Sequence, residues 1–370
     1  MVYLVNTSNL KVGGGVQVAD SILRQLHLYD SHQFVVVLSS ALGYLKSYLK
    51  QYSNNCVYVS YDMPHSFTGI IRGKNFFLDD LVDEYQVTAV YTVFGPSLWR
   101  PKVKHICGFA RPQLIYTDSP FFQNLSLLNR IKSYFREKIK LYNFDITSDC
   151  LVTESDDVSF RLKNLLPLKC IYTITNSYNQ IFKCPEMWTP LYLEPFDGLT
   201  MLTISANYPH KNLGIIPQIL DYIDANNIQL KIRFVVTLSE IDFYVDEKFS
   251  SRILRIGKIA NSACPTLLQQ CDFMFLPTLL ECFSASYPEA MYMNKPIITS
   301  DLPFARSLCG DAALYVDSLS PKSIVESLLH VTEDTISALV ENGKKQLDKY
   351  DTAETRCKKI VELLEKIDKS

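Results

Sequence analysis

The sequence predicts an α/β protein built from two Rossmann-like, doubly wound domains that face a cleft. Its 370 residues exceed one ordinary domain of about 100 to 200 residues. Short β-branched or aromatic runs alternate with helical patterns in both halves, which is typical of parallel sheets covered by helices. Between residues 175 and 198, three prolines and a glycine interrupt every regular period. We therefore expect domains at 1–180 and 199–350, and a helix at 351–370 that could pack back on the first domain.

The first domain should contain six strands joined by helices. Strands are expected at 2–6, 33–39, 56–60, 88–94, 113–117 and 170–174. A glycine-rich turn follows the first strand, and a helix is expected near 15–29. Several strand runs are too uniformly apolar to face water on one side, so helices should cover the sheet.

The second domain repeats the alternation after the linker. Strands are expected at 199–205, 230–237, 252–257, 272–277, 296–300 and 313–317. Helices are expected at 211–226 and 285–294. Ser320-Pro321 should open a further helix, because serine caps the first turn and proline fits inside it.

A last helix should begin within Asp351–Glu354. Its apolar residues form one stripe: Ala353, Cys357, Ile360, Val361 and Leu364. An apolar stripe of this kind must be buried, so this helix should dock on another part of the protein.

Composition excludes some classes of function and favours one compartment. Lys and Arg total 37 against 39 Asp and Glu, and the net charge of -2 gives no general attraction to nucleic acid. The ten cysteines show no C-x-x-C pair, so we expect reduced, mostly buried thiols. No apolar run approaches the roughly 18 residues of a membrane span, and the chain opens directly into a strand. These features predict a cytoplasmic protein.

The first candidate site is the run Gly13-Gly14-Gly15 after the first strand. Consecutive glycines let backbone approach a ligand closely, and the following helix offers free N–H groups to an anion. The run is not a dinucleotide fingerprint, because Val18 stands where the third glycine is needed, and it is not a P-loop. An ordinary strand-to-helix turn is an equally good interpretation.

The second candidate site follows the strand that opens the second domain. Lys211 would start the next helix there, with Asn207 and His210 just before it. Ligands of open α/β sheets collect at this edge, and a lysine supplies a point charge for phosphate. Taken alone, Lys211 would also fit a solvated surface residue, and His210 a loop residue with a local hydrogen bond.

The third candidate site, Pro277–Met291, is the most specific. A buried strand ends at Pro277, a turn of small residues follows, and a helix begins near Ser284–Ser286, with free N–H groups for a diphosphate. Glu281 should face the ligand, and Glu289, eight positions later, could accept hydrogen bonds from a sugar diol. A capping box of Ser286 and Glu289 is the alternative, but it would leave Glu281 without a role.

These motifs resemble a known family. The E-x7-E pattern of Glu281 and Glu289, the following Lys295-Pro296 segment, the glycine run and His210-Lys211-Asn212 are similar to retaining glycosyltransferases of the GT-B fold, family-4 type (glycosyl transferases group 1). The resemblance covers residues 199–331 best. It implies that a nucleotide sugar binds mainly to the second domain and the acceptor to the first.

The resemblance also assigns roles by position. Glu289 would hold the nucleotide ribose, Glu281 the donor sugar and Lys211 the diphosphate, while Gly257-Lys258-Ile259 would meet the base. Gly14 and Gly15 would form the cleft wall. The full set of expected binding residues is Gly13, Gly14, Gly15, Asn207, His210, Lys211, Gly257, Lys258, Ile259, Glu281, Cys282, Phe283, Ser284, Ala285 and Glu289.

Two positions depart from the family pattern. The family commonly has Gly-Arg ahead of the lysine, whereas this chain has Ser205-Ala206-Asn207. It often has His or His-Asp after a mid-sheet strand of the first domain, where this chain has Thr117-Asp118. We take Asp118, with Glu281 and Lys211, as the candidate catalytic residues. No Asp-x-Asp stands at a sheet edge, so we expect no metal and no cofactor, with Lys211 and helix N-termini stabilising the leaving diphosphate.

A basic segment lies between Arg100 and Lys140. It contains nine Lys and Arg residues, and its acidic residues are Asp118 and Glu137. Within it Leu128, Ile131, Phe135, Ile139 and Tyr142 fall on one helical stripe. Such a helix could lie on anionic lipid, with Arg130, Lys132 and Arg136 as contacts. It could equally be a surface helix that packs its stripe on the sheet. Nucleic acid is not an expected partner, since the rest of the chain offers no basic track.

The sequence thus predicts a metal-independent glycosyltransferase. It would move a sugar, with retention, from a nucleotide diphosphate sugar to a hydroxyl of a saccharide or lipid-linked saccharide. The setting would be synthesis of a cell-surface polysaccharide such as lipopolysaccharide, in the cytoplasm or peripherally on the inner membrane face. The alternatives are a nucleotide-sugar epimerase of GT-B fold and a catalytically weak sugar-binding subunit of a polysaccharide assembly.

Overall fold

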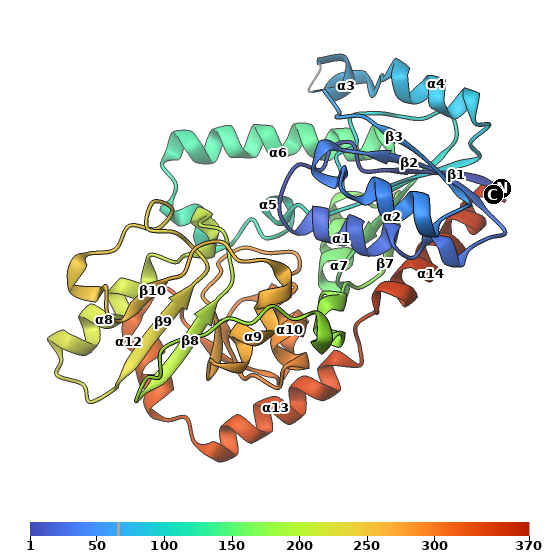
Figure 1. Cartoon of the computed structure of the whole chain (residues 1–370). Helices are drawn as coiled ribbons and strands as arrows, with labels where there is room; N and C mark the ends of the chain where they lie inside the picture. The colour runs from blue at the N-terminus through green and yellow to red at the C-terminus, as the bar shows by residue number, and fades with distance from the viewer. Residues whose placement is uncertain (65–66, 370) are drawn as a thin grey trace. The chain divides into compact units, whose positions relative to one another are not determined.

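The computed structural model describes residues 1–64 and 67–369 and divides them into two compact units, each built on a parallel sheet (Figure 1). Unit 1 comprises Met1–Thr117, Leu125–Asn176 and Asp351–Ser370. Unit 2 comprises Asp118–Asn124 and Ser177–Tyr350. The units differ from the expected domains in two respects: the short segment Asp118–Asn124 belongs with unit 2, and unit 2 begins at Ser177, so it includes the expected linker.

Unit 1 contains a seven-stranded parallel sheet in the order β3-β2-β1-β4-β5-β6-β7. Its strands are β1 Val2–Asn6, β2 Gln33–Leu38, β3 Cys56–Ser60, β4 Ala89–Thr92, β5 Lys104–Gly108, β6 Cys150–Thr153 and β7 Cys170–Thr173. In register, Val5 pairs with Val36 on one side and Tyr91 on the other. The order of strands reverses between β1 and β4, and loops at such a reversal are where open α/β sheets bind ligands.

Helices cover both faces of this sheet. They are α1 Gly14–Leu23, α2 Leu45–Tyr52, α3 Phe67–Arg72, α4 Phe76–Glu84, α5 Pro112–Ile115, α6 Leu127–Thr147, α7 Asp156–Leu165 and α14 Ala353–Asp368, with 3-10 turns η1 Leu26–Leu28 and η2 Ser40–Leu42. Tyr3 and Tyr91 pack with residues of α1 and α14, whereas Leu4 and Val90 pack with residues of α4. Neighbouring residues of a strand point to opposite faces, so each strand contributes to two cores.

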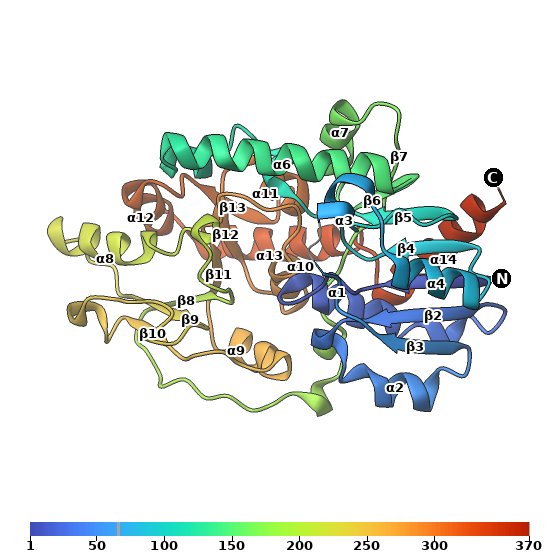
Figure 2. The ribbon, with the colours of Figure 1, turned by 90° about the horizontal axis from the view of Figure 1, so that it is seen from above.

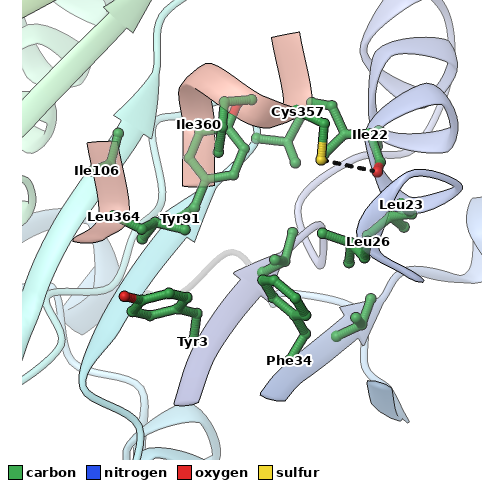
Figure 3. Close-up of a cluster of buried hydrophobic side chains, with 14 of the residues drawn as sticks. Tyr3, Ile22, Leu23, Leu26, Phe34, Tyr91, Ile106, Cys357, Ile360 and Leu364 are labelled. Carbon is green, nitrogen blue, oxygen red and sulfur yellow. Dashed lines mark hydrogen bonds between the residues drawn. The ribbon is translucent and has the colours of Figure 1, made fainter. Parts of the chain in front are cut away.

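The C-terminal helix α14 completes the first of these cores. Cys357, Ile360 and Leu364 lie against Tyr3 and Tyr91, and the Sγ of Cys357 donates to the carbonyl of Ile22 at 3.8 Å (Figure 3). The side chain of Thr352 caps the helix by accepting a hydrogen bond from the amide of Thr355. The expected stripe is therefore buried in unit 1, although the whole of Ser177–Tyr350 separates it in sequence from the rest of that unit.

One predicted strand of unit 1 is wrong. Residues 113–117 do not form a strand; Pro112 occupies the first turn of the short helix α5 instead. The strands that continue the sheet are β5 and β6, which the sequence pattern did not reveal. Short apolar runs do not distinguish strand from helix, and β5 ends in Gly108, where an added Cβ would lie 1.8 Å from the carbonyl oxygen of Val93.

Unit 2 contains a six-stranded parallel sheet in the order β10-β9-β8-β11-β12-β13. Its strands are β8 Leu199–Thr203, β9 Ile232–Val236, β10 Ile253–Arg255, β11 Phe273–Leu276, β12 Ile297–Ser300 and β13 Ala313–Val316. Each lies within an expected range. The strand order reverses between β8 and β11, so the ligand-binding edge predicted by topology is the pair of loops that follow these two strands.

The helices of unit 2 are α8 Ile215–Ala225, α9 Cys264–Gln269, α10 Ser286–Tyr292, α11 Pro303–Cys309, α12 Pro321–Leu329 and α13 Glu333–Leu347. The 3-10 turns are η3 Pro120–Asn124, η4 Gln180–Lys183, η5 Pro185–Met187, η6 Pro209–Lys211, η7 Glu247–Phe249 and η8 Asn261–Ala263. Helices α8 and α12 pack on one face of the sheet against Met201, Phe234 and Phe275. The side chain of Ser320 caps α12 as predicted.

The 21-residue helix α6 lies beside α3 (Figure 2). It is amphipathic, but it buries polar side chains and exposes many apolar ones. Its buried side chains include Ser133, Glu137 and Asn143. Leu141 and Phe144 are buried too, but seven other large apolar side chains are exposed, and we call them the apolar face of α6: Leu127, Leu128, Ile131, Tyr134, Phe135, Ile139 and Tyr142. The alternative that this stripe packs on the sheet is therefore wrong. None of the described helices is long and apolar enough to cross a bilayer.

Candidate functional site

The candidate site is centred on an ion pair between Lys211 and Glu281. Lys211 follows β8 and Glu281 follows β11, so the pair lies at the strand-order reversal of unit 2. The Nζ of Lys211 donates to Oε2 of Glu281, and the two side chains are 17% and 18% exposed. The amide of Leu279 also donates to the carbonyl of His210 at 2.8 Å, which joins the two loops through their backbones.

A left-handed residue sets the direction of Lys211. Lys211 ends the 3-10 turn η6, and the next residue, Asn212, has φ of 54°. Asparagine is among the few residues that tolerate this conformation, and its Nδ2 donates to the carbonyl of Ser318 at 2.7 Å. The chain then enters α8 at Ile215, four residues later than the expected start at 211. Lys211 therefore lies in a fixed turn ahead of a helix, and not in the helix itself.

His210 lies beside the ion pair among aromatic rings. Its ring stacks on Tyr208 at 5.6 Å and meets Phe121 edge-on at 6.2 Å. Burial lowers the pKa of His210, although the charge of Glu281 opposes that shift. The imidazole should accordingly be neutral near pH 7 and available as a hydrogen-bond donor or acceptor.

The placement predicted for Asp118 is wrong. Asp118 was expected after a mid-sheet strand of the first domain, but the preceding segment is α5, and Asp118 lies in an exposed turn of unit 2. Its neighbour Ser119 donates through Oγ to the carbonyl of Leu279 at 2.6 Å. This segment is therefore hydrogen-bonded to the loop that carries Glu281. The strand end expected before Asp118 is absent, and its catalytic role stays a prediction.

Glu289 occupies the first turn of α10 and is partly buried. Burial raises the pKa of Glu289 to about 7, even though a hydrogen bond with the backbone of Asn179 favours the carboxylate. The N-cap of α10 is Ala285, which has no side-chain cap, so the capping box of Ser286 and Glu289 is wrong. Glu289 thus has a carboxyl whose pKa is raised toward neutral pH, and it has no capping role.

The turn between these two glutamates is mostly a buried support. Cys282 and Phe283 are buried, and the ring of Phe283 meets that of Tyr350 edge-on at 5.6 Å. Ser284 and Ala285 are partly exposed. Of the expected binding residues in this turn, only Ser284 and Ala285 therefore have surface available to a ligand along with Glu281.

The expected base-binding loop lies at the end of the sheet. Gly257-Lys258-Ile259 follows the edge strand β10. Strand β9 lies between β10 and β8 in the sheet. Gly257 has φ of 75°, and its amide donates to the carbonyl of Leu238 at 3.0 Å. Asn207 reaches toward this side, because its Nδ2 donates to the carbonyl of Asp242 at 2.7 Å. The loops after β8, β9 and β10 thus adjoin along one edge.

Sequence reasoning missed Arg255 at the end of β10. Its Nη2 donates to Glu240 at 3.1 Å, and its buried Nε has no acceptor among the described residues. An arginine within the strand pattern RILRIG gives no signal of such a role, because it resembles any polar residue on an edge strand. Arg255 adds a cation at the end of the edge strand β10, two strands from β8, which precedes Lys211.

The glycine run lies in unit 1, between β1 and α1. Gly13 is the N-cap of α1 with φ of 79°, a conformation that side chains rarely adopt. An added Cβ at Gly13 or Gly14 would meet no described atom within 4 Å, whereas at Gly15 it would lie 3.3 Å from Leu10. A side chain at Gly15 would thus have to displace Leu10 slightly, whereas the surface of Gly13 and Gly14 is open.

Comparisons with known proteins match part of unit 2 to one family. Residues 201–334, which include both glutamates and Lys211, match the family model described as glycosyl transferases group 1. The O-antigen chain mannosyltransferase RfbU of Salmonella typhimurium strain LT2 is 24% identical over 142 residues. That alignment covers 37% of this chain and 40% of the mannosyltransferase, so it spans less than half of the relative.

Solved structures match nearly the whole chain. A glycosyltransferase from Rickettsia africae ESF-5 has a TM-score of 0.69, covering 99% of this chain and 98% of that one at 15% identity. Anabaena Alr3699/HepE in complex with UDP and glucose has a TM-score of 0.64, covering 98% and 99% at 14% identity. At identities this low, the similarity shows the fold alone. The TM-scores over nearly the whole chain confirm the predicted fold class of two Rossmann-like domains. Residues 201–334 are therefore similar to the glycosyl transferases group 1, and the chain has the GT-B fold.

Proposed function

We propose that the protein transfers a sugar, with retention, from a nucleoside diphosphate sugar to a hydroxyl of a saccharide or lipid-linked saccharide. The observation that carries the proposal is the Lys211–Glu281 pair at the strand-order reversal of unit 2. The similarity to an O-antigen mannosyltransferase supports a role in synthesis of a cell-surface polysaccharide such as lipopolysaccharide. The HepE complex supports a uridine nucleotide as the first donor class to test.

The pair of side chains suits both parts of a sugar nucleotide. The ammonium of Lys211 can contact the diphosphate, and Glu281 can then accept hydrogen bonds from the hydroxyls of the donor sugar. Because the two already touch, the lysine is positioned before the ligand arrives. Glu289 would accept the ribose diol once its carboxyl is ionised.

The reaction exchanges one bond to the anomeric carbon for another. The bond from that carbon to the diphosphate oxygen breaks as the bond from the acceptor oxygen forms. The departing diphosphate oxygen takes the proton that the acceptor hydroxyl loses. Lys211 and the amide of Ser286 at the start of α10 stabilise the negative charge that grows on the diphosphate, and we propose that they do so without a metal.

We further propose that the protein works in the cytoplasm and associates peripherally with the inner face of the membrane through α6. Arg130, Lys132 and Arg136 are all exposed on this helix, beside its apolar face. Apolar side chains flanked by cations are suited to insertion at the surface of an anionic bilayer.

The deciding experiment is a product assay with the purified single chain. UDP-linked and GDP-linked sugars are incubated with and without a lipid-linked saccharide, and the products are separated and analysed by NMR. We expect a glycosylated acceptor with the anomeric configuration of the donor. Free sugar in equal amounts without acceptor would favour an epimerase or hydrolase, and no turnover of any donor would favour a sugar-binding subunit.

A further inference from the structure

Unit 1 contains a cavity of about 690 Å³ at the ligand-binding edge of its own sheet. The loops that follow β1, β3, β4 and β5 all contribute to its lining, together with α3 and α6. This edge includes the strand-order reversal between β1 and β4, where a ligand of an α/β sheet is expected. All of the residues that form it belong to unit 1.

The lining combines cations with an apolar wall. Four of its described residues are cationic and none is acidic: Lys11, Arg111, Arg136 and Lys140. Six others are apolar: Met63, Ile70, Ile71, Pro96, Leu98 and Ile139. A free sugar would need many hydrogen-bonding groups, which such a wall does not supply. The combination is suited instead to a molecule with an anionic group at one end and a hydrocarbon at the other.

A single buried carboxylate holds the cations in place. Glu137 of α6 is only 4% exposed, and it accepts hydrogen bonds from Arg111 at 2.7 Å, Lys140 at 2.9 Å and Arg136 at 3.2 Å. Burial works against the charge of Glu137, but hydrogen bonds from Arg111 and Lys140 outweigh it, so its pKa lies below the usual range. Three cations share one anion here, which leaves an excess of positive charge beside the cavity.

The pKa of Lys140 reflects this excess of positive charge. Burial and the nearby charge of Arg111 lower the pKa of Lys140, although its ion pair with Glu137 opposes the shift. A bound anion would supply the missing countercharge to both residues. Arg111 and Lys140 are each about one quarter exposed, so both can reach a ligand in the cavity.

Asn9 supplies an unused acceptor in the same cavity. Its Nδ2 donates to the carbonyls of Phe94 at 2.5 Å and Pro96 at 3.3 Å, which fixes the orientation of the amide. Its Oδ1 is buried and has no donor among the described residues. A buried acceptor without a partner is costly, and a ligand hydroxyl would satisfy it.

We propose that this cavity binds the head of a lipid-linked saccharide, a phosphate or diphosphate ester of a long-chain alcohol. Arg111 and Lys140 would hold the phosphate, Asn9 would accept a hydrogen bond from the saccharide, and the apolar wall would contact the first carbons of the lipid. Glu137 is the positioning residue that orients the two cations. The inference rests on the proposed function, because the bound lipid would be the sugar acceptor.

One further observation supports a lipid, and a second supports a ligand site at this position. Ile139 lines the cavity and also belongs to the apolar face of α6, so the cavity adjoins the surface proposed to touch the membrane. Leu98 has φ of 52°, and its amide donates to Oδ1 of Asn143 at 3.2 Å. A leucine in this strained conformation indicates a local constraint of the kind that collects at ligand sites.

The test is calorimetric titration of the full chain with farnesyl diphosphate, farnesol and inorganic pyrophosphate. We expect farnesyl diphosphate to bind at least about tenfold more tightly than either of the others, because each matches only half of the site. Arg111→Gln and Lys140→Gln should each weaken binding by about tenfold. Leu98→Asn suits the left-handed backbone but removes the apolar contact, and it should weaken farnesyl diphosphate without affecting pyrophosphate.

Glu137→Gln tests the positioning role by the sign of its effect. If only net charge mattered, removing a carboxylate would tighten binding of the anion. Loss of orientation predicts weaker binding instead. If this variant does not fold, Glu137→Asp takes its place, and it should weaken binding less than Arg111→Gln. The matched control is Lys50→Gln, which removes an exposed charge from α2 and should leave affinity unchanged.

The outcomes separate this inference from the proposed function. UDP is titrated into the same samples, and Lys211→Gln should weaken UDP without changing farnesyl diphosphate, whereas Arg111→Gln should do the reverse. Two results, each with normal UDP binding, would overturn the lipid-head site alone. One is pyrophosphate binding as tightly as farnesyl diphosphate. The other is an unchanged affinity of Arg111→Gln for farnesyl diphosphate. Farnesol as tight as farnesyl diphosphate would overturn the phosphate assignment. Binding of farnesyl diphosphate with no donor turnover would leave the cavity assigned and remove the proposed function.

Discussion

At the scale of single residues, Glu289 carries the clearest prediction for donor binding. Glu289→Ala should weaken a nucleoside diphosphate sugar by roughly tenfold or more, because hydrogen bonds to a charged group contribute about 1.5 to 3 kcal/mol. Since Glu289 has no capping role, its loss should not lower the melting temperature. Calorimetry with UDP measures the first effect, with the exposed Glu326→Ala of α12 as control. Unchanged affinity would contradict the assignment.

The raised pKa of Glu289 predicts two opposite responses to pH. The carboxyl has a pKa of about 7 in the folded protein, above its value near 4.5 in the unfolded chain. Its contribution to stability is thus fully present below pH 4.5 and is lost as pH rises through 7. Glu289→Gln should therefore gain stability relative to wild type between pH 5 and 8, by roughly 1 to 3 kcal/mol in urea unfolding.

The affinity for the donor should rise with pH, whereas the contribution of Glu289 to stability falls. Only the carboxylate form accepts both hydroxyls of a ribose, so wild-type affinity for UDP should rise between pH 6 and 8. Glu289→Gln should remove that rise. A pH-independent affinity in the wild type would show that the ribose does not contact Glu289.

Lys211 should matter more for turnover than for folding. Its charge counts most as negative charge grows on the diphosphate, so Lys211→Ala should lower kcat by about a hundredfold or more, with little change in melting temperature. The exposed Lys231→Ala is a control that leaves the site intact. Addition of EDTA should leave the wild type active. Loss of transfer on chelation, restored by Mg²⁺ or Mn²⁺, would contradict the metal-free mechanism.

The sequence predicted residues whose role follows from a local motif and missed those whose role follows from distant contacts. Lys211 and Glu281 stand at strand ends, and the structure brings them together across 70 positions. Asn9 and Arg111 carry no local signal, because their partners lie 85 and 26 positions away. Asp118 was misplaced because its position was counted from a strand that does not exist.

At the scale of elements, α6 shows why an amphipathic pattern does not reveal which face is buried. Its stripe was visible in the sequence, but the buried side holds Glu137, with Arg111 as partner from another segment. The same ambiguity affected α5 and β5, since short apolar runs fit strand or helix equally well. Longer apolar runs, such as those of β2 and β9, were correctly predicted as strands because both strands are buried on both faces.

The exposed face of α6 predicts reversible binding to anionic membranes. Each basic residue near such a surface adds about 1 kcal/mol, and the flanking apolar side chains add burial. Co-sedimentation with anionic liposomes should therefore be lost at 1 M salt, where the Debye length is about 3 Å. Replacing Arg130 and Lys132 with Gln should reproduce that loss without changing UDP affinity. Equal sedimentation with neutral and anionic liposomes would leave α6 as an ordinary solvated face.

At the scale of the whole molecule, the most consequential arrangement is that the chain returns at its end to the unit where it began. Helix α14 joins the core formed by β1, β2 and β4, and Arg356 forms a buried ion pair with Glu154. The stripe in the sequence predicted that this helix docks. Which surface receives it depends on contacts across the full length of the chain, so no local pattern specifies them.

This return predicts that unit 1 cannot be completed without the last twenty residues. Six apolar side chains of α14 lie in the unit 1 core: Cys357, Ile360, Val361, Leu363, Leu364 and Ile367. Burying each contributes about 1.5 to 3 kcal/mol, so their joint loss is of the order of a domain's whole stability. A chain ending at Tyr350 should therefore leave unit 1 open to proteolysis while Ser177–Tyr350 stays resistant. Leu364→Ala, which leaves one cavity, should cost about 2 to 5 kcal/mol. Equal protection of both units in the shortened chain would mean that α14 is an accessory to unit 1 and not part of its core.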